Sequence, residues 1–315
     1  MHESNAQWQA GGLVQGRFRI VRRVGAGGMG EVYLAEDRQL GRKVALKLLP
    51  PPFTADADRT RRFEQEACAA SALNHPNIII IYDIVRDGST HFIVAEFIEG
   101  VSLRQYMAGA RMVVLEALDV AIQVADALSA VHDINVAHRD VKPENIMLRP
   151  DGRVKILDFG LAKLTKAQPG GVDLQGTRMT LVTTMPGVVL GTPGYMSPEQ
   201  ACGERVDWRT DIFSFGVVLY EMLAGHLPFE GKTVGEVIVS TLSKAPPPLK
   251  GHAPEIPDGL QEIVSSALCK DREQRNQTAS ELIKVLRGLR LKAGNTHQDY
   301  TADCLSSPQQ NSTLI

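Results

Sequence analysis

Two short stretches carry residue types suited to phosphoryl transfer: HRDVKPEN at residues 138–145 and DFG at residues 158–160. This reaction needs little covalent help from a protein, because catalysis depends on positioning the reactants and neutralising developing charge. Asp140 has a carboxylate that could accept the proton of an attacking hydroxyl, and Asn145 and Asp158 have the oxygen donors that Mg²⁺ prefers. Each residue alone is more often a surface, capping or turn residue. The ordered set within so short a span points to phosphoryl transfer.

A glycine cluster, GAGGMGEV at residues 25–32, lies between two predicted strands. Glycines let backbone N–H groups approach phosphates without a Cβ in the way. The motif by itself also fits a flexible hairpin tip or a dinucleotide-binding Rossmann loop. A Rossmann loop requires a helix directly after the glycines, whereas a strand-like run, EVYLA, follows here, so that alternative is excluded.

Lys47 ends the strand-like run VALK and follows the glycine cluster by about one hairpin, which makes it a candidate to contact phosphates. A lysine in that role needs a carboxylate to hold it. The predicted helix at residues 59–73 offers Glu64 and Glu66. Glu66 lies at the edge of the apolar face of that helix and Glu64 points further toward solvent, so Glu66 is favoured. An ordinary surface glutamate remains the alternative for either.

Composition limits the class of protein. The 315 residues include 43% hydrophobic and 22% charged residues, which are globular values. The net charge is −2, so no basic field suggests nucleic acid or an anionic membrane as a partner. No basic, then apolar, N-terminal signal and no apolar run long enough to span a bilayer is visible, so we expect no membrane segment in this chain.

The cysteines are widely spaced and form no CxxC pair: Cys68, Cys202, Cys269 and Cys304. This pattern favours independent reduced thiols over a disulfide framework or a zinc site, and therefore predicts a cytoplasmic protein.

The first third of the chain is rich in predicted strands, with one embedded helix, and suggests a small, mainly antiparallel lobe. The expected strands cover residues 18–24, 31–36, 43–49, 78–85 and 90–96, and the helix covers residues 59–73.

After Gly100 the pattern changes to helices, expected at residues 115–132, 209–223, 234–242, 260–268 and 279–289. Residues 165–192 lack any sustained period and predict a long loop, which in compact domains is usually functional or disordered. The polar segment from about residue 292 to 315 predicts a disordered tail.

The motifs GAGGMGEVYLAED, LNHPNI, HRDVKPENIM and GTPGYMSPEQ resemble the bacterial branch of the eukaryotic-type, or Hanks-type, serine/threonine protein kinases. The resemblance covers roughly residues 18–289. It implies an α+β, two-lobed fold, with a small lobe at residues 18–98 and a larger, mostly helical lobe at residues 99–290. Residues 1–17 would then form an N-terminal extension, and residues 291–315 the disordered tail.

The resemblance also implies ATP and Mg²⁺, or alternatively Mn²⁺, as cofactors. Lys47, held by Glu66, would contact the α- and β-phosphates. Asp140 would be the catalytic base, Lys142 would steady the γ-phosphate and mark Ser/Thr specificity, and Asn145 and Asp158 would bind the metal. The nucleotide would further contact Gly25, Ala26, Gly27, Gly28, Met29, Gly30, Val32, Ala45, Glu96 and Ile98.

Other positions take structural roles by the same resemblance. Thr192 would contact Asp140 and Lys142 and help form the floor of the substrate site. Glu199 would pair with Arg275.

Asp211 would hydrogen-bond the backbone of the catalytic loop. Ala95 stands where many relatives have a larger gatekeeper residue, so the pocket behind the adenine should be unusually open.

Arg139 precedes the catalytic aspartate, and in the family this arginine needs an anionic partner. A phosphothreonine in the segment after DFG could supply it. Thr184 is the favoured site of autophosphorylation, with Thr183 as a second candidate, although a threonine-rich loop can also be merely polar.

These inferences predict a kinase that phosphorylates Ser/Thr in proteins and associates with a second copy for autophosphorylation. Two alternatives stay open. A pseudokinase would bind partners or nucleotide without transfer, and a small-molecule phosphotransferase could share the same core. The filled catalytic positions argue against the first, and Lys142 and Arg275 against the second.

Overall fold

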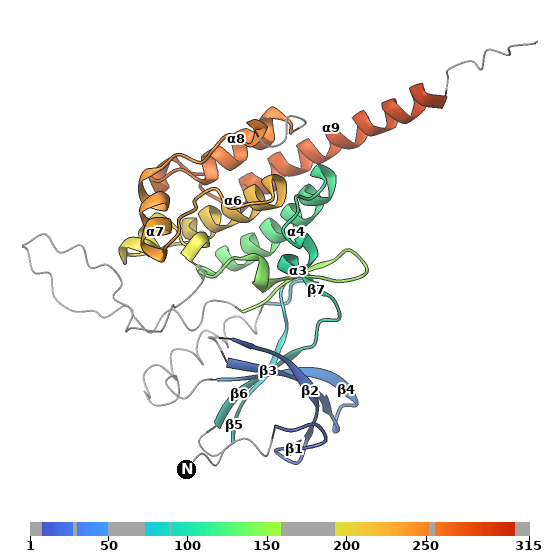
Figure 1. The fold of residues 1–315 in the computed structure, drawn as a ribbon. Coiled ribbons are helices and arrows are strands. Elements are labelled where there is room, and N and C mark those ends of the chain that lie inside the picture. Colours follow the sequence, from blue (N-terminus) through green and yellow to red (C-terminus); the bar gives the residue numbers. More distant parts are fainter. Residues whose placement is uncertain are drawn as a thin grey trace, which may run out of the picture.

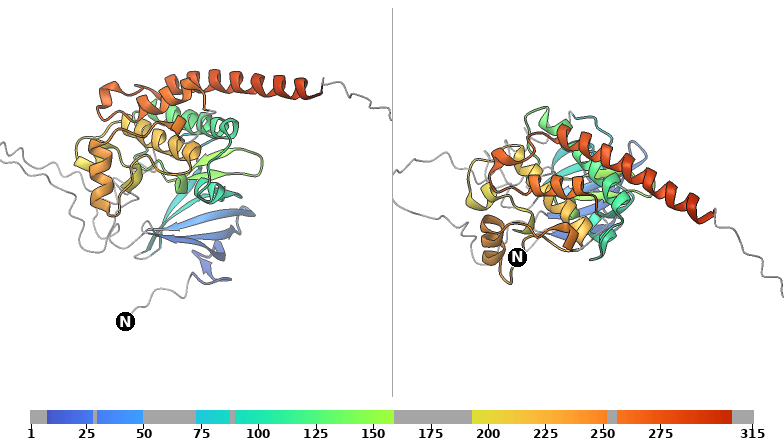
Figure 2. Two further views of the ribbon diagram at one scale, coloured as in Figure 1. Left: turned by 45° about the horizontal axis from the view of Figure 1, so that its top comes forward. Right: turned by 90° about the horizontal axis from the view of Figure 1, so that it is seen from above.

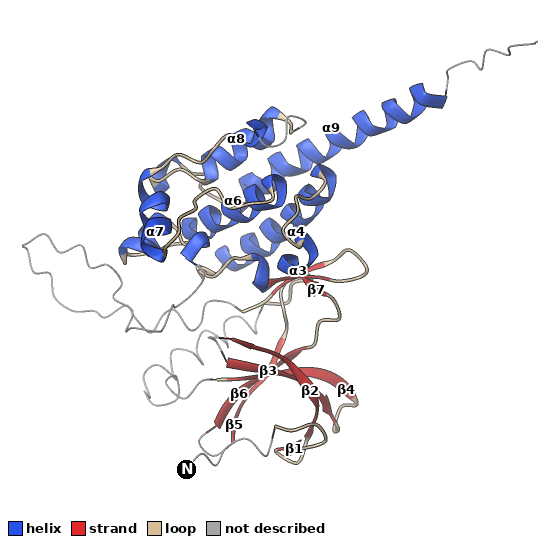
Figure 3. Cartoon of the chain, in the orientation of Figure 1, coloured by secondary structure: helices blue, strands red, loops and turns tan. Residues whose placement is uncertain are grey.

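The computed structural model describes residues 8–27, 30–49, 73–87, 90–158, 193–251 and 256–305, with side chains described up to residue 293. Strands from the N-terminal part form one lobe, and helices from the rest of the chain form a second lobe on top of it (Figure 1). Figure 3 shows this division by colour, with the strands of the sheet below and the helices above. The expected α+β, two-lobed architecture is confirmed.

The small lobe is a six-stranded antiparallel sheet with the strand order β1-β2-β3-β4-β6-β5. Buried positions alternate along β4, as expected for a strand with one covered face. Val44 and Leu46 are buried, and Lys47, on the opposite face, is partly exposed to the cleft. The strands are β1 (Leu13–Val14), β2 (Phe18–Gly27), β3 (Gly30–Asp37), β4 (Arg42–Leu48), β5 (Ile81–Asp87) and β6 (Thr90–Glu96).

The segment from Trp8 to Arg17, which was predicted as an N-terminal extension, packs on this lobe. β1 pairs with β2, and the Trp8 ring packs between Tyr33 and Phe92. The local sequence around Trp8 is polar and glycine-rich, with no period, so it gave no sign of this packing. The apolar surface that the indole covers comes from β3 and β6, which lie far along the chain.

The fourth predicted strand starts too early. Ile78 forms a parallel bridge with Ile156, and the Ile79 amide donates to the Ile156 carbonyl at 3.0 Å, so these residues join the lobes. β5 itself begins at Ile81. The apolar pattern of residues 78–85 predicts a strand but does not show which sheet each residue pairs with. The helix predicted at residues 59–73 lies outside the described residues.

The large lobe packs its helices around α6, which is buried along almost its whole length. α4 and α9 lie side by side, and α9 extends beyond the rest of the lobe (Figure 2). The helices are α3 (Leu103–Met107), α4 (Val114–His132), α5 (Pro198–Cys202), α6 (Arg209–Ala224), α7 (Val234–Ser243), α8 (Asp258–Ala267) and α9 (Ala279–Leu305). None of the helices in the described ranges combines the length and apolarity that crossing a bilayer requires.

α9 runs well past its predicted end at Leu289, through residues that the sequence favoured as a disordered tail. Ion pairs from Arg290 to Asp119 and from Arg287 to Asp126 fix it on α4. Once a helix is nucleated, each further residue adds a hydrogen bond, so a polar continuation costs little. A polar sequence therefore does not exclude a helix.

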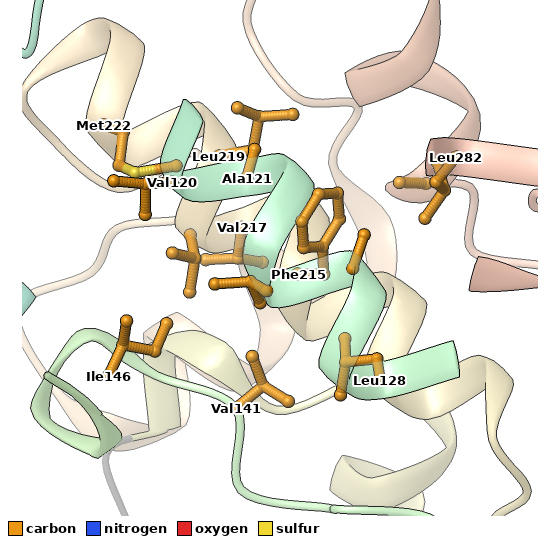
Figure 4. Packing of buried hydrophobic residues seen from close by; sticks show 14 of the residues in the cluster. Val120, Ala121, Leu128, Val141, Ile146, Phe215, Val217, Leu219, Met222 and Leu282 are labelled. Carbon is orange, nitrogen blue, oxygen red and sulfur yellow. The ribbon is translucent and has the colours of Figure 1, made fainter. Parts of the chain in front are cut away.

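A second, three-stranded sheet joins the lobes and is formed by β7 (Val101–Ser102), β8 (Ile146–Leu148) and β9 (Val154–Ile156). Gly100 must be glycine, because a Cβ there would lie 2.2 Å from the Leu148 carbonyl oxygen. Val141 and Ile146 flank the catalytic loop and point into the helical core beside Val217 (Figure 4). These buried anchors hold residues 142–145 between them against α4 and α6.

Candidate active site

A cavity of about 380 Å³ lies between the two lobes. This volume is in the range typical of small-molecule sites. Eight of the residues predicted to contact nucleotide or metal line it: Gly25, Val32, Ala45, Lys47, Glu96, Ile98, Asn145 and Asp158.

The catalytic loop gathers three of the predicted residues at one carboxylate. Lys142 Nζ lies 2.9 Å from Asp140 Oδ2, and Asn145 Nδ2 donates to the same oxygen at 2.8 Å. Asn145 Nδ2 also donates to the Asp140 backbone carbonyl at 2.9 Å. All three side chains are buried. Because the Asn145 amide nitrogen faces Asp140, its carbonyl oxygen is the atom that could ligate a cation.

Lys47 and Asp158 connect the two lobes across the cavity, with Lys47 Nζ at 2.7 Å from Asp158 Oδ2. Lys47 comes from β4, where the register places it opposite Val32 of the glycine-cluster hairpin. Asp158 follows β9 in a left-handed backbone conformation, at φ 44°. The structure therefore brings the candidate phosphate-binding amine and the candidate metal-binding carboxylate to one place.

Asp211, at the start of α6, holds the backbone of the catalytic loop as predicted. Its carboxylate is fully buried and accepts from the amides of His138 and Arg139, each at 2.7 Å. His132 Nε2 lies 2.9 Å from the same carboxylate.

The predicted pair of Glu199 and Arg275 is present in bidentate form, with both N–O distances at 2.8 Å. Both side chains are buried. Burial acts to raise the pKa of Glu199, but the hydrogen bonds and charge of Arg275 outweigh it and leave that pKa below its usual value. The pair fastens the start of α5 to the loop before α9.

Comparison with known proteins identifies the family. The model of the protein kinase domain matches residues 18–285. This chain belongs to the protein kinase family. Its relatives include the serine/threonine-protein kinase pkn2 of Myxococcus xanthus, 41% identical over 87% of this chain and 32% of that protein. Another is PrkC of Bacillus subtilis, 37% identical over 86% of this chain and 40% of that protein.

The chain thus spans well under half the length of these curated relatives. Among solved structures, the kinase domain of PknI from Mycobacterium tuberculosis is similar, with a TM-score of 0.68 and 26% identity. That alignment covers 89% of this chain and 99% of the PknI chain. The expectation that this chain belongs to the protein kinase family is confirmed, and these relatives are bacterial serine/threonine-protein kinases.

Several predicted site residues are not brought to the cavity or cannot be placed. Ala26, Gly27 and Gly30 lie at the tip of the β2–β3 hairpin, where Gly27 pairs with Gly30, and they do not line the cavity. The remaining predicted residues lie outside the described part of the chain: Gly28, Met29, Glu66, Thr183, Thr184 and Thr192.

The hinge between the lobes contains an interaction that sequence reasoning missed. The buried Lys155 Nζ lies 2.8 Å from Glu96 Oε2 and donates to the Ile78 carbonyl at 3.0 Å. The Glu96 amide donates to the Ile80 carbonyl at 2.8 Å, so any contact of the Glu96 backbone with adenine must use its carbonyl oxygen. The one available signal was a lysine flanked by the two apolar residues of β9.

Proposed function

We propose that this kinase transfers the γ-phosphoryl group of ATP to Ser or Thr hydroxyls of proteins. The observation that carries the proposal is the convergence of Lys142 and Asn145 on Asp140, beside a cavity that also contains Lys47 and Asp158. In-line transfer needs an oriented hydroxyl and a cationic environment for the phosphates, and these residue types supply both.

In this proposal Asp140 accepts a hydrogen bond from the acceptor hydroxyl and orients its oxygen toward the γ-phosphorus. Lys142, which lies against the same carboxylate, steadies the γ-phosphate. Asn145 and Asp158 fit Mg²⁺, because an amide oxygen and a carboxylate can hold this ion together with phosphate oxygens and water. Bound there, Mg²⁺ or Mn²⁺ would neutralise phosphate charge. Lys47 would exchange its contact with Asp158 for the α- and β-phosphates.

A protein acceptor is favoured over a small molecule by the relatives, which are named as protein kinases, and by Lys142. The Glu199–Arg275 pair supports the same choice, because it fastens the segment directly after the predicted substrate floor to the large lobe.

Incubation of the full chain with Mg-ATP and a generic protein substrate, followed by intact-mass measurement, tests the proposal. We expect phosphate on the protein substrate, its loss in Asp140→Asn, and its loss when the metal is chelated. Asp151→Asn is the matched control, since Asp151 is an exposed carboxylate on the β8–β9 turn and does not line the cavity. A wild-type chain that binds ATP yet transfers no phosphate would instead identify a pseudokinase.

Autophosphorylation is a further part of the proposal, with Thr184 as the preferred site, Thr183 as the second, and Arg139 as the partner of the new phosphate. Two protein copies would have to meet, so the initial rate per molecule should rise with protein concentration. Phosphosite mapping of wild type and of Thr184→Ala checks the assignment. Active enzyme with neither threonine modified would refute it.

A further inference from the structure

One guanidinium lies between two carboxylates at the edge of the active-site cleft. Arg104 Nε donates to Glu144 at 2.8 Å, and Arg104 Nη1 donates to Glu221 at 2.6 Å. The remaining Nη2 donates to the Tyr195 hydroxyl, which in turn donates to Glu221 at 2.5 Å. We call Glu144, Glu221 and Tyr195 the cation socket and Arg104 its occupant.

The cation socket stands on the elements that shape the acceptor side of the cleft. Glu144 precedes Asn145 on the catalytic loop and lines the cavity between the lobes. Tyr195 ends the GTPGY segment, in which the substrate floor is predicted. Glu221 lies on α6, which also carries Asp211. A peptide that presents its hydroxyl to Asp140 would therefore place neighbouring side chains close to this socket.

Charge and burial suit the socket to a cation. Glu221 is almost completely buried and Glu144 is partly open to the cleft. Burial acts to lower the pKa of Arg104, but hydrogen bonds to Glu221 and Glu144 outweigh it and raise that pKa. Burial, followed by the charge of Glu221, raises the pKa of Tyr195, so the phenol stays a neutral donor. Two carboxylates thus face one permanently charged guanidinium.

We propose that Arg104 occupies from within the same chain the place that a basic residue of a protein substrate could otherwise fill. The kinase then does not select Arg or Lys near the acceptor, and Arg104 is a specificity-determining residue. Guanidinium and carboxylate groups match in fork geometry, so a substrate arginine is the side chain that the emptied socket would recognise best. This inference rests on the proposed protein kinase activity.

Peptides that share one Ser acceptor and differ only in the position of a single Arg among neutral residues test the proposal. For wild type we expect the kcat/KM ratio of Arg-containing to Arg-free peptide to stay near one at every position. For Arg104→Ala we expect the ratio to rise at one position by about tenfold, the factor of one charge-assisted hydrogen bond. Adding Glu221→Gln to Arg104→Ala should reduce that gain.

The matched control is Arg149→Ala. Arg149 is 37% exposed, as against 36% for Arg104, and it also pairs with a carboxylate, that of Asp151, but it lies outside the cleft. Its peptide profile should equal that of wild type. A wild type that already prefers Arg at the position in question, or an Arg104→Ala enzyme with an unchanged profile, would overturn the proposal.

A second measurement separates the socket from the chemistry. N-acetyl-arginine amide should raise the melting temperature of Arg104→Ala. It should do so less for Arg104→Met, whose side chain still fills the socket, and it should leave wild type unaffected. The rise in melting temperature is expected even if no variant transfers phosphate. In that case the proposed kinase activity would be refuted, whereas the proposed cation socket would be supported. If the amide neither raises the melting temperature of either variant nor refolds it, Arg104 only joins α3 to α6, and the proposal is wrong.

Discussion

Replacing Trp8 by alanine is expected to destabilise the small lobe by about 3–5 kcal/mol. Trp8 is only 7% exposed, and its ring centroid lies 5.2 Å from that of Tyr33 and 5.4 Å from that of Phe92. A buried indole removes about 150–250 Å² from water. At ~25 cal/mol per Å² this corresponds to about 4–6 kcal/mol, an upper bound because the unfolded chain already buries some surface.

The measurement is equilibrium unfolding in urea, with the free energy taken from the midpoint and slope. The chain has two tryptophans, and Trp208 is the matched control. Trp208 is 40% exposed and its Nε1 donates to the Gln277 carbonyl at 3.1 Å, so Trp208→Ala should cost only about 1 kcal/mol. In a Trp208→Phe background, fluorescence reports on Trp8 alone.

A loss below about 1 kcal/mol in Trp8→Ala, or one equal to that of Trp208→Ala, would refute the packing argument. The segment before Phe18 would then be an extension outside the folded lobe. A loss in the expected range, together with weaker ATP binding, would show that this segment supports the sheet that carries Lys47.

Three further substitutions test charged groups. Lys155→Met should destabilise the fold by about 3 kcal/mol, because it leaves the Glu96 carboxylate without its cationic partner. Glu96→Gln in the same chain should recover much of that loss, and equal losses in the single and double variants would contradict this reasoning. Burial, followed by the charge of Arg275, lowers the pKa of Lys270 from 10.5 to about 8. Between pH 8 and pH 10.5 the unfolded chain therefore binds more protons than the folded chain, so the free energy of unfolding should rise with pH in this range. Lys270→Met should flatten the rise, and an unchanged slope would refute this reasoning. The lowered pKa of Glu199 contributes stability that is fully present above pH 4.5, the ordinary pKa of a glutamate, and is lost as the pH falls through the pKa of the folded state. Glu199→Gln should remove this dependence of stability on acid pH and cost about 3 kcal/mol at neutral pH. Acid unfolding identical to that of wild type would contradict this expectation.

The catalytic residues could be predicted from the sequence because their chemistry and their order are local. Asp140, Lys142 and Asn145 lie within six consecutive positions, and the short loop that joins them leaves few ways to separate their side chains. Strand and helix positions were predictable for a similar reason, since one buried face imposes a period on neighbouring residues. The packing of Trp8 and the full length of α9 were not visible in the sequence, because distant elements set the environment of these residues.

Charge pairs over long sequence separations leave no local pattern. Arg104 meets Glu221 across 117 positions and Tyr195 across 91, and Lys155 meets Glu96 across 59. A lysine or arginine in such a segment is most often a solvated side chain, so a single sequence gives no reason to single it out. Only the packing of α3 and β9 against their neighbours pairs these cations with the buried Glu221 and the partly buried Glu96.

The backbone of the catalytic loop shows how the fold holds a strained arrangement ready for chemistry. Arg139 has φ 64°, a left-handed conformation that costs a non-glycine residue about 1–2 kcal/mol. Asp211 accepts from the amides of His138 and Arg139, and hydrogen bonds to a charged group contribute about 1.5–3 kcal/mol each. Gln200 Nε2 donates to the Arg139 carbonyl at 3.0 Å and so fixes the next peptide, on the other side of the Arg139 Cα. These contacts together exceed the strain, so the loop keeps its turn, and the carboxylate of Asp140 is held in place by α5 and α6 before any acceptor hydroxyl arrives.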